Sequence, residues 1–148
     1  MKFVGQPHRV HIEKQMSFTF INPDSLGAPR GYSNGVLTVG GTLLFIAGQV
    51  AWDQQQQIVS ADLVEQFDRA LANVITIVTE AGAQPEQIAR LVIYVTDKQE
   101  YRRRMKEIGE RYRARMGRHF PAMVLVEVKD LLEDDARIEI EGIAVLGP

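Results

Sequence analysis

Two runs of β-branched residues near the end of the chain, residues 122–128 and 137–145, predict a pair of strands. Side chains alternate between the two faces of a strand, so Met123 and Leu125 are expected on one face of the first run. Glu139 is expected opposite the isoleucines that flank it in the second run. A hairpin across the polar segment between the runs is the simplest connection. This arrangement predicts that Met123, Leu125 and Glu139 lie on the side of the sheet away from the core.

The first third of the chain predicts three more strands. Residues 17–21 alternate between polar and apolar, and after a loop rich in proline and glycine residues 36–39 form a second short strand. Gly40 and Gly41 predict a tight hairpin turn, because a primed turn needs positive φ at both central positions. The returning strand, residues 42–50, is almost continuously apolar, which favours a central strand buried on both faces.

Two amphipathic helices flank a further strand in the middle of the chain. The first helix is capped by Ser60 or Asp62 and ends near Gly82, which suits the left-handed residue after a last helical turn. A strand at residues 89–95 follows. The second helix spans residues 97–117, beginning with a capping-box pattern and ending at a glycine.

The resulting order, βββαβαββ, predicts one α+β domain over residues 1–148, in which residues 1–16 form a loosely attached extension. Both helices can cover the same face of one mixed sheet of about six strands. The other face would then carry apolar side chains from residues 42–50 and from Met123 and Leu125. A patch of this size predicts contact with further copies of the chain, with ligand sites in the clefts between them.

Composition narrows the function classes. The chain has 148 residues and 45% hydrophobic residues, which is enough for a core without a metal or disulfide staple. A net charge of −2 gives no reason to expect nucleic acid or an anionic membrane as a partner. Cysteine is absent, which excludes thiol chemistry, and His8 and His11 lack carboxylates at metal-binding spacing, so no metal site is expected. The opening residues have no apolar stretch of signal-peptide length, and we expect a cytoplasmic protein.

Several segments resemble the RidA (YjgF/YER057c/L-PSP) family, in the right order over about residues 18–146. Arg-Gly-Tyr-Ser-Asn-Gly-Val resembles the family's Gly-Pro-Tyr-Ser-x-x-Val loop, and Phe-Ile-Ala-Gly-Gln resembles its F-x-S-G-Q strand. The matching segments are residues 30–36, 45–49, 66–73, 120–122 and 138–141. The resemblance implies a chorismate-mutase-like fold that assembles as a homotrimer with three inter-subunit clefts.

The resemblance also implies a chemistry. Active members of the family hydrolyse reactive enamines and imines, such as 2-aminoacrylate, to a keto acid and ammonia, without metal or organic cofactor. Glu139 matches the glutamate that positions the attacking water. The matching pocket residues are Tyr32, Ser33, Asn34, Gly48 and Gln49.

The sequence departs from the family at two positions. Met123 stands where an arginine is expected to hold the substrate carboxylate, and a thioether offers no donor to a carboxylate. Met105 aligns with an asparagine that many members place near the cleft. Met123 predicts poor deamination of 2-aminoacrylate and an altered substrate, unless Arg30, Arg118 or Arg137 supplies the charge.

Each candidate also has a structural interpretation. Glu139 can be a solvated strand-edge carboxylate, Tyr32 an interface aromatic and Met123 a pocket-lining residue, while His119 is either a general acid or base or simply solvated. The arginine-rich second helix is better explained as a solvated face than as an RNA-binding face, because glutamates intersperse it. Three function classes stay open: a Rid-type hydrolase with an altered pocket, a trimer that binds a metabolite without chemistry, and an RNA-processing or translation-inhibiting protein.

Overall fold

A computed structural model describes residues 17–147, and the N-terminal extension expected at residues 1–16 lies outside the described residues. The strands are β1 (Thr19–Ile21), β2 (Gly35–Leu37), β3 (Thr42–Gln49), β4 (Ile88–Val95), β5 (Ala122–Glu127) and β6 (Ile138–Leu146). The helices are α1 (Leu63–Glu80), α2 (Lys98–Arg103) and α3 (Met105–Met116), with 3-10 turns at Asp24–Leu26 and Pro85–Gln87. The α+β class, the mixed sheet and the order of strands and helices are confirmed.

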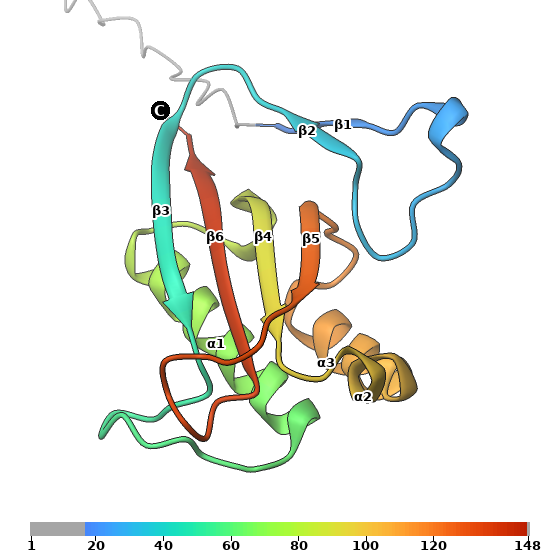
Figure 1. Cartoon of the computed structure of the whole chain (residues 1–148). Coiled ribbons are helices and arrows are strands. Elements are labelled where there is room, and N and C mark those ends of the chain that lie inside the picture. Colours follow the sequence, from blue (N-terminus) through green and yellow to red (C-terminus); the bar gives the residue numbers. More distant parts are fainter. Residues whose placement is uncertain (1–16, 148) are drawn as a thin grey trace, which may run out of the picture.

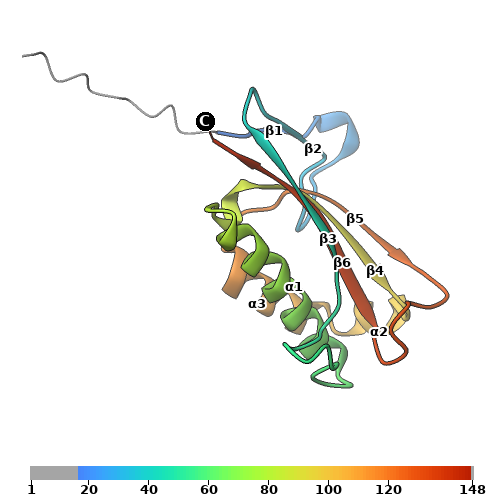
Figure 2. The same ribbon diagram turned by 90° about the vertical axis from the view of Figure 1, so that its left-hand side faces the viewer.

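The main sheet has four strands in the order β3-β6-β4-β5, and α1 and α3 cover one of its faces (Figures 1 and 2). The helix α1 begins where the sequence predicts, because the Asp62 carboxylate accepts a hydrogen bond from the Glu65 amide at 3.0 Å. Its apolar stripe, which includes Phe67, Leu71 and Val74, is fully buried against the sheet. This contact forms the core.

The second predicted helix is divided. Arg104 leaves helical geometry (φ −106°, ψ 16°), so α2 and α3 are separate helices where one was expected over residues 97–117. Neither proline nor glycine lies at the break. The Arg104 side chain forms ion pairs with Asp62 at the start of α1 and with Glu107 in α3, so the break coincides with a tertiary contact that apolar spacing does not reveal.

Both predicted hairpins are wrong. Gly40 and Gly41 have positive φ as expected, but the turn sends the chain away from β2, which pairs instead with β1 in a separate two-stranded sheet. The six strands are therefore divided between two sheets. β5 pairs in parallel with β4, and β6 lies between β3 and β4, antiparallel to both. The helices α2 and α3 supply the crossover that a parallel pair requires.

Met123 and Leu125 lie on the helix-covered face, contrary to the prediction. In the parallel register Met123 pairs with Leu91 and Leu125 with Ile93, and neighbouring residues in register share a face. Leu91 and Ile93 are buried in the core, and Met123 and Leu125 pack against it. Because both faces of β5 are apolar, alternation alone cannot say which face is inward. Glu139 does lie away from the core, as predicted, since the flanking isoleucines are buried beneath the helices.

Within residues 17–147, no helix covers the other face of the four-stranded sheet, which we call the bare face (Figure 2). Phe45 is 71% exposed, Leu43 55%, Val124 42% and Val126 39%. β3 is therefore an edge strand that is buried on one face, and the expectation of burial on both faces does not hold in one chain. Within the described residues, the helix-free apolar surface predicted from the sequence is present, with valines of β5 in place of Met123 and Leu125.

Candidate functional site

A cavity of about 640 Å³ lies between β5 and the α2–α3 segment. Two of the residues singled out from the sequence, Tyr32 and Met123, line it together, and so does Met105. Most of the remaining wall is apolar, with contributions from α1, α3 and β4. Met123 therefore lines a partly open, largely apolar cavity on the helix side of the sheet, and Val124 extends this cavity to the edge of β5.

Ser33 holds the Tyr32 loop against the start of β5. Its hydroxyl donates a hydrogen bond to the carbonyl oxygen of Phe120 at 2.6 Å, and its amide donates to the carbonyl oxygen of Pro121 at 3.0 Å. The amide of Asn34 donates to Oδ1 of Asn22 at 2.7 Å. Ser33 and Asn34 do not line the cavity, and their contacts explain how the loop places Tyr32 at its wall.

Glu139 and Gly48 meet on the bare face. A Cβ built on Gly48 would lie 2.1 Å from Oε1 of Glu139 and 2.8 Å from its Cδ, so a larger residue here would force this carboxylate to move. Within residues 17–147, the Glu139 side chain has no hydrogen-bond or ion-pair partner although it is half-buried. A half-buried carboxylate without a partner is available to a water molecule or a ligand.

The polar side chains near Glu139 form hydrogen bonds to other groups. Tyr94, which pairs with Glu139 in register, donates its hydroxyl proton to Glu141 at 2.6 Å. This hydrogen bond to the Glu141 carboxylate raises the pKa of Tyr94. Gln49 follows a register shift in β3, and its side-chain amide donates to the carbonyl oxygen of Ala47 at 3.1 Å.

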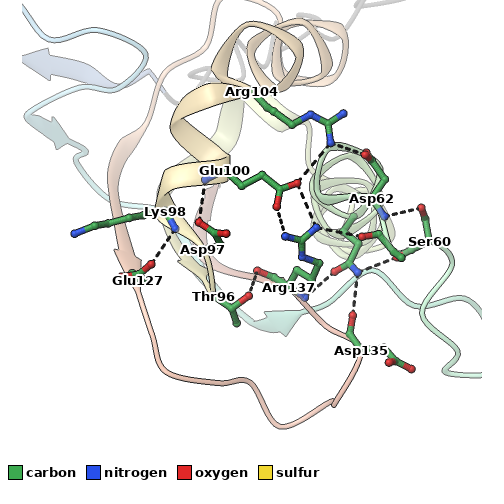
Figure 3. Close-up of polar contacts among 12 residues, drawn as sticks. Ser60, Asp62, Thr96, Asp97, Lys98, Glu100, Arg104, Glu127, Asp135 and Arg137 are labelled. Carbon is green, nitrogen blue, oxygen red and sulfur yellow. Dashed lines mark hydrogen bonds and ion pairs between the residues drawn. The ribbon is translucent and has the colours of Figure 1, made fainter.

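Of the three arginines proposed to replace the missing family arginine, only Arg30 lines the cavity. Arg137 belongs to the ion-pair network at one end of the sheet, where it binds Glu100 and donates to the carbonyl oxygen of Ala61 at 3.2 Å (Figure 3). Arg118 lines a different hollow, beside the buried His119. His119 itself is anchored through Nε2 to the carbonyl oxygen of Ile88 at 2.6 Å, which accounts for it as a structural residue.

Sequence reasoning missed two cavity residues, Arg102 and Arg113. A signal for them exists, because Arg102, Met105, Gly109 and Arg113 recur at intervals of three and four residues and so share one side of a helical segment. The guanidinium of Arg113 lies across Gly109, with Nη1 3.2 Å from a Cβ built there. The arginines of this segment were interpreted together as a solvated face, and the structure separates those at the cavity from those in ion pairs.

Two tyrosines line the cavity from α2 and α3. Burial raises the pKa of Tyr101 to about 12, so its hydroxyl stays protonated at neutral pH. Burial also raises the pKa of Tyr112, whose hydroxyl donates to the carbonyl oxygen of His119 at 2.6 Å. The Tyr101 hydroxyl has no hydrogen-bond partner in the part of the chain that the structure describes, and it is not fully enclosed.

In residues 17–147 no three histidine or acidic side chains come together in an arrangement that could hold a metal ion. His8 and His11 lie outside the described residues. None of the described helices has the length and apolarity needed to span a membrane.

Comparison with known proteins gives a consistent family. The sequence pattern of the family described as "Endoribonuclease L-PSP" matches residues 23–146. A RutC family protein from Pyrococcus abyssi is 33% identical over 90% of this chain and 98% of its own length. The 2-iminobutanoate/2-iminopropanoate deaminase of Salmonella typhimurium is 32% identical over 88% of this chain and 98% of its own length. A solved structure of a conserved Rid family protein of unknown function from Yersinia pestis has a TM-score of 0.78 and 32% identity, covering 87% of this chain and 98% of the other.

Proposed function

This chain belongs to the endoribonuclease L-PSP family, to which the RidA and RutC proteins also belong, and from that membership we propose that it works as a homotrimer with a small-molecule site in each cleft between subunits. The proposed activity is hydrolysis of a reactive imine to a carbonyl compound and ammonia. Three of the relatives it matches are named for the deamination of 2-iminobutanoate and 2-iminopropanoate. No cofactor is part of the proposal.

The separation of the candidate residues within one chain is the observation that carries this proposal. Tyr32 and Met123 line the cavity on the helix side of the sheet, while Gly48 and Glu139 meet on the bare face. Glu139 and Met123 lie on opposite faces of the sheet, on strands that β4 separates, so one chain does not bring their side chains together. A second copy packed on the bare face can place the Glu139 of one subunit beside the cavity of another, and that packing would also remove exposed apolar surface from water.

In the proposed reaction Glu139 acts as a general base. It accepts a proton from a water molecule while the water oxygen bonds to the imine carbon, and the C=N bond becomes the C–N bond of a carbinolamine. Glu139 gives this proton to the nitrogen to complete the neutral carbinolamine. The carbinolamine hydroxyl then passes its own proton through Glu139 to the amino group as the C–N bond breaks, so that ammonia leaves and the oxygen forms the carbonyl. The unpartnered carboxylate and the space that Gly48 provides support this role.

The substrate is proposed to differ from a small imino acid because Met123 offers no donor where the family resemblance expects an arginine. The test uses imino acids generated in situ by an amino-acid oxidase, with the wild type, Met123→Arg and Glu139→Gln. We expect little acceleration by the wild type of the hydrolysis of 2-iminopropanoate, the imine tautomer of 2-aminoacrylate, and a gain in Met123→Arg. Glu139→Gln should remove the gained activity when it is combined with Met123→Arg. Equal activity with and without Glu139 would contradict its assignment as the base.

A trimer that binds a metabolite without chemistry is the second candidate. The observation that favours it is the lack of a carboxylate anchor on β5, since a reaction that needs this anchor loses much of its transition-state binding. Binding of unreactive ligands in the absence of turnover on any imine tested would support this candidate over the hydrolase.

An RNA-directed activity is a third and less supported candidate, in spite of the family's description. In the α2–α3 segment Arg104, Arg111 and Arg115 are held by carboxylates, which reduces the positive field available to a phosphate backbone. RNA binding that weakens steeply with added salt would revive it.

A further inference from the structure

We propose that the cavity beside Met123 binds an anion with a large apolar body, such as an aromatic or long-chain carboxylate, and that Arg30, Arg102 and Arg113 hold its charge in place of a β5 arginine. This inference rests on the proposed function for the role of the cavity and names the class of ligand it takes.

The charge of the cavity wall is the first argument. Arg30, Arg102 and Arg113 line the cavity, and among residues 17–147 no aspartate or glutamate does. Because the whole chain has a net charge of −2, this local excess of positive charge is not a reflection of composition. A wall that contains only cations favours an anionic ligand, and planar guanidinium groups can bind a carboxylate through two parallel hydrogen bonds.

The pairing of the arginines is the second argument. Arg104, Arg111, Arg115 and Arg137 form ion pairs with carboxylates. Within residues 17–147, the three cavity arginines have neither a carboxylate within ion-pair distance nor a hydrogen-bond acceptor. Arginines of the same helical segment thus differ: the paired ones join helices together, and those at the cavity are exposed and, within residues 17–147, have no protein partner.

The size and lining of the cavity are the third argument. A volume of about 640 Å³ is within the range of sites that enclose drug-sized ligands. Ile93, Met105, Met123 and Leu125 supply an apolar wall, and methionine adapts to ligands of irregular shape. The Tyr101 hydroxyl, a neutral donor without a partner among residues 17–147, can add one hydrogen bond. The wall therefore matches a ligand with one charged end and a bulky apolar remainder.

Isothermal titration calorimetry with three unreactive probes tests the proposal. The probes are 4-phenylbutyrate, its neutral amide and acetate. We expect 4-phenylbutyrate to bind about tenfold or more tightly than the amide, since hydrogen bonds to a charged group exceed neutral ones. Acetate should bind more weakly still, because it lacks the apolar body. Equal binding of the acid and the amide would overturn the charge assignment, and undetectable binding of 4-phenylbutyrate would overturn the whole proposal.

Substitutions locate the binding. Arg102→Gln and Arg113→Gln should each weaken 4-phenylbutyrate binding about fivefold or more and leave binding of the amide unchanged. Arg103→Gln is the matched control, because Arg103 is an exposed arginine next to Arg102 that does not line the cavity. Thermal melting checks that each variant is folded, and Arg102→Lys should retain part of the affinity. Unchanged acid binding in folded Arg102→Gln and Arg113→Gln would overturn the proposal.

The binding result is independent of the imine assay. Selective binding of the acid without imine hydrolysis upholds this inference and defeats the hydrolase proposal. Imine hydrolysis without preference for the acid over the amide upholds the proposed function and overturns the inference.

Discussion

The two faces of the four-stranded sheet have similar apolar character and opposite environments. On the helix-covered face, Ile138 and Ile140 are buried completely beneath α1. On the bare face Leu43 and Phe45 are more than half exposed. The difference teaches that apolar residues indicate which surface must be covered, while the covering partner, a helix or another copy of the chain, follows from the topology.

The polar groups of the two faces differ in the same way. Beside the covered face, carboxylates of the ion-pair network bind arginines and backbone amides, and they join the start of α1 to α2 and β6 (Figure 3). On the bare face Glu139 lacks such a partner within residues 17–147. A carboxylate with hydrogen-bond and ion-pair partners is explained by its contribution to the fold, whereas a carboxylate without such a partner is a candidate for a functional role.

The largest expected effect comes from making the same substitution on both faces. Leu71→Ala on the covered face should lower the free energy of unfolding by about 2–5 kcal/mol, because it opens a cavity in a fully buried site. Leu43→Ala on the bare face should lower the stability of the isolated subunit much less. Denaturant unfolding of both variants at low protein concentration measures the difference. Similar losses in a monomeric sample would mean that the bare face is covered within one chain.

Phe45→Lys tests whether the bare face meets copies of itself. A lysine at this exposed position would place charges in an apolar contact, so we expect about a hundredfold or greater shift from trimer toward monomer. Analytical ultracentrifugation measures the shift, with Leu132→Lys as the control at an exposed apolar residue in the loop before β6. A wild type that sediments as a monomer would refute the proposed trimer.

Arg137→Gln should weaken the ion-pair network beside the covered face. The substitution removes the bonds from the guanidinium to Glu100 and to the carbonyl oxygen of Ala61, and we expect a loss of about 1 kcal/mol, because these groups are partly exposed. Thermal unfolding measures the loss. If Arg137→Gln instead changed imine hydrolysis while stability stayed the same, the separation of Arg137 from the site would be wrong.

Gly48→Ala should perturb Glu139 at a modest cost in stability. The new methyl group would force the carboxylate into another rotamer, costing about 0.5–1.5 kcal/mol. Removing the carboxylate with Glu139→Ala should reduce the cost of Gly48→Ala, and a double-mutant cycle measures this coupling. Purely additive effects would show that the two residues do not meet.

Acid should weaken the covered side gradually. Hydrogen bonds from Arg104 and Arg115 hold the pKa of Asp62 and Asp68, respectively, below their usual values. A carboxyl group with a lowered folded-state pKa adds stability above its unfolded-state pKa near 4, and this stability is lost as the pH falls through the folded-state pKa. Unfolding measured between pH 5 and pH 2 should show this decline, and Asp68→Asn should make the decline shallower. An unchanged profile in Asp68→Asn would mean that the pair with Arg115 is weak in solution.

Much of the local structure could be predicted because its signals are local. Asp62 and Asp97 cap helices as expected, each accepting a hydrogen bond from the amide three residues later. The apolar strand predicted at residues 42–50 matches β3 to within one residue. Strand pairing could not be predicted in this way, because the partners of β6 are chosen by tertiary packing rather than by neighbouring residues.

The candidate site, too, could be predicted only in part, because some of its features depend on tertiary packing. Glu139 and Gly48 could be proposed together only through the family resemblance, and their separation from Met123 required the register of β5 with β4. Arg102 and Arg113 were missed, because the difference between a paired and an unpaired arginine depends on acidic residues distant in sequence, such as Asp62 and Asp68.

The central position of β6 has a consequence for synthesis. Among the described residues β6 comes last in sequence, and it separates β3 from β4, so these earlier strands have no direct hydrogen bonds to each other (Figure 1). During synthesis β3 and β4 leave the ribosome before β6 does. The apolar stripe of α1 therefore cannot pack against β6 until residues 138–146 have been made. A polypeptide stalled before residue 138 therefore cannot complete the sheet and is a natural client for chaperones.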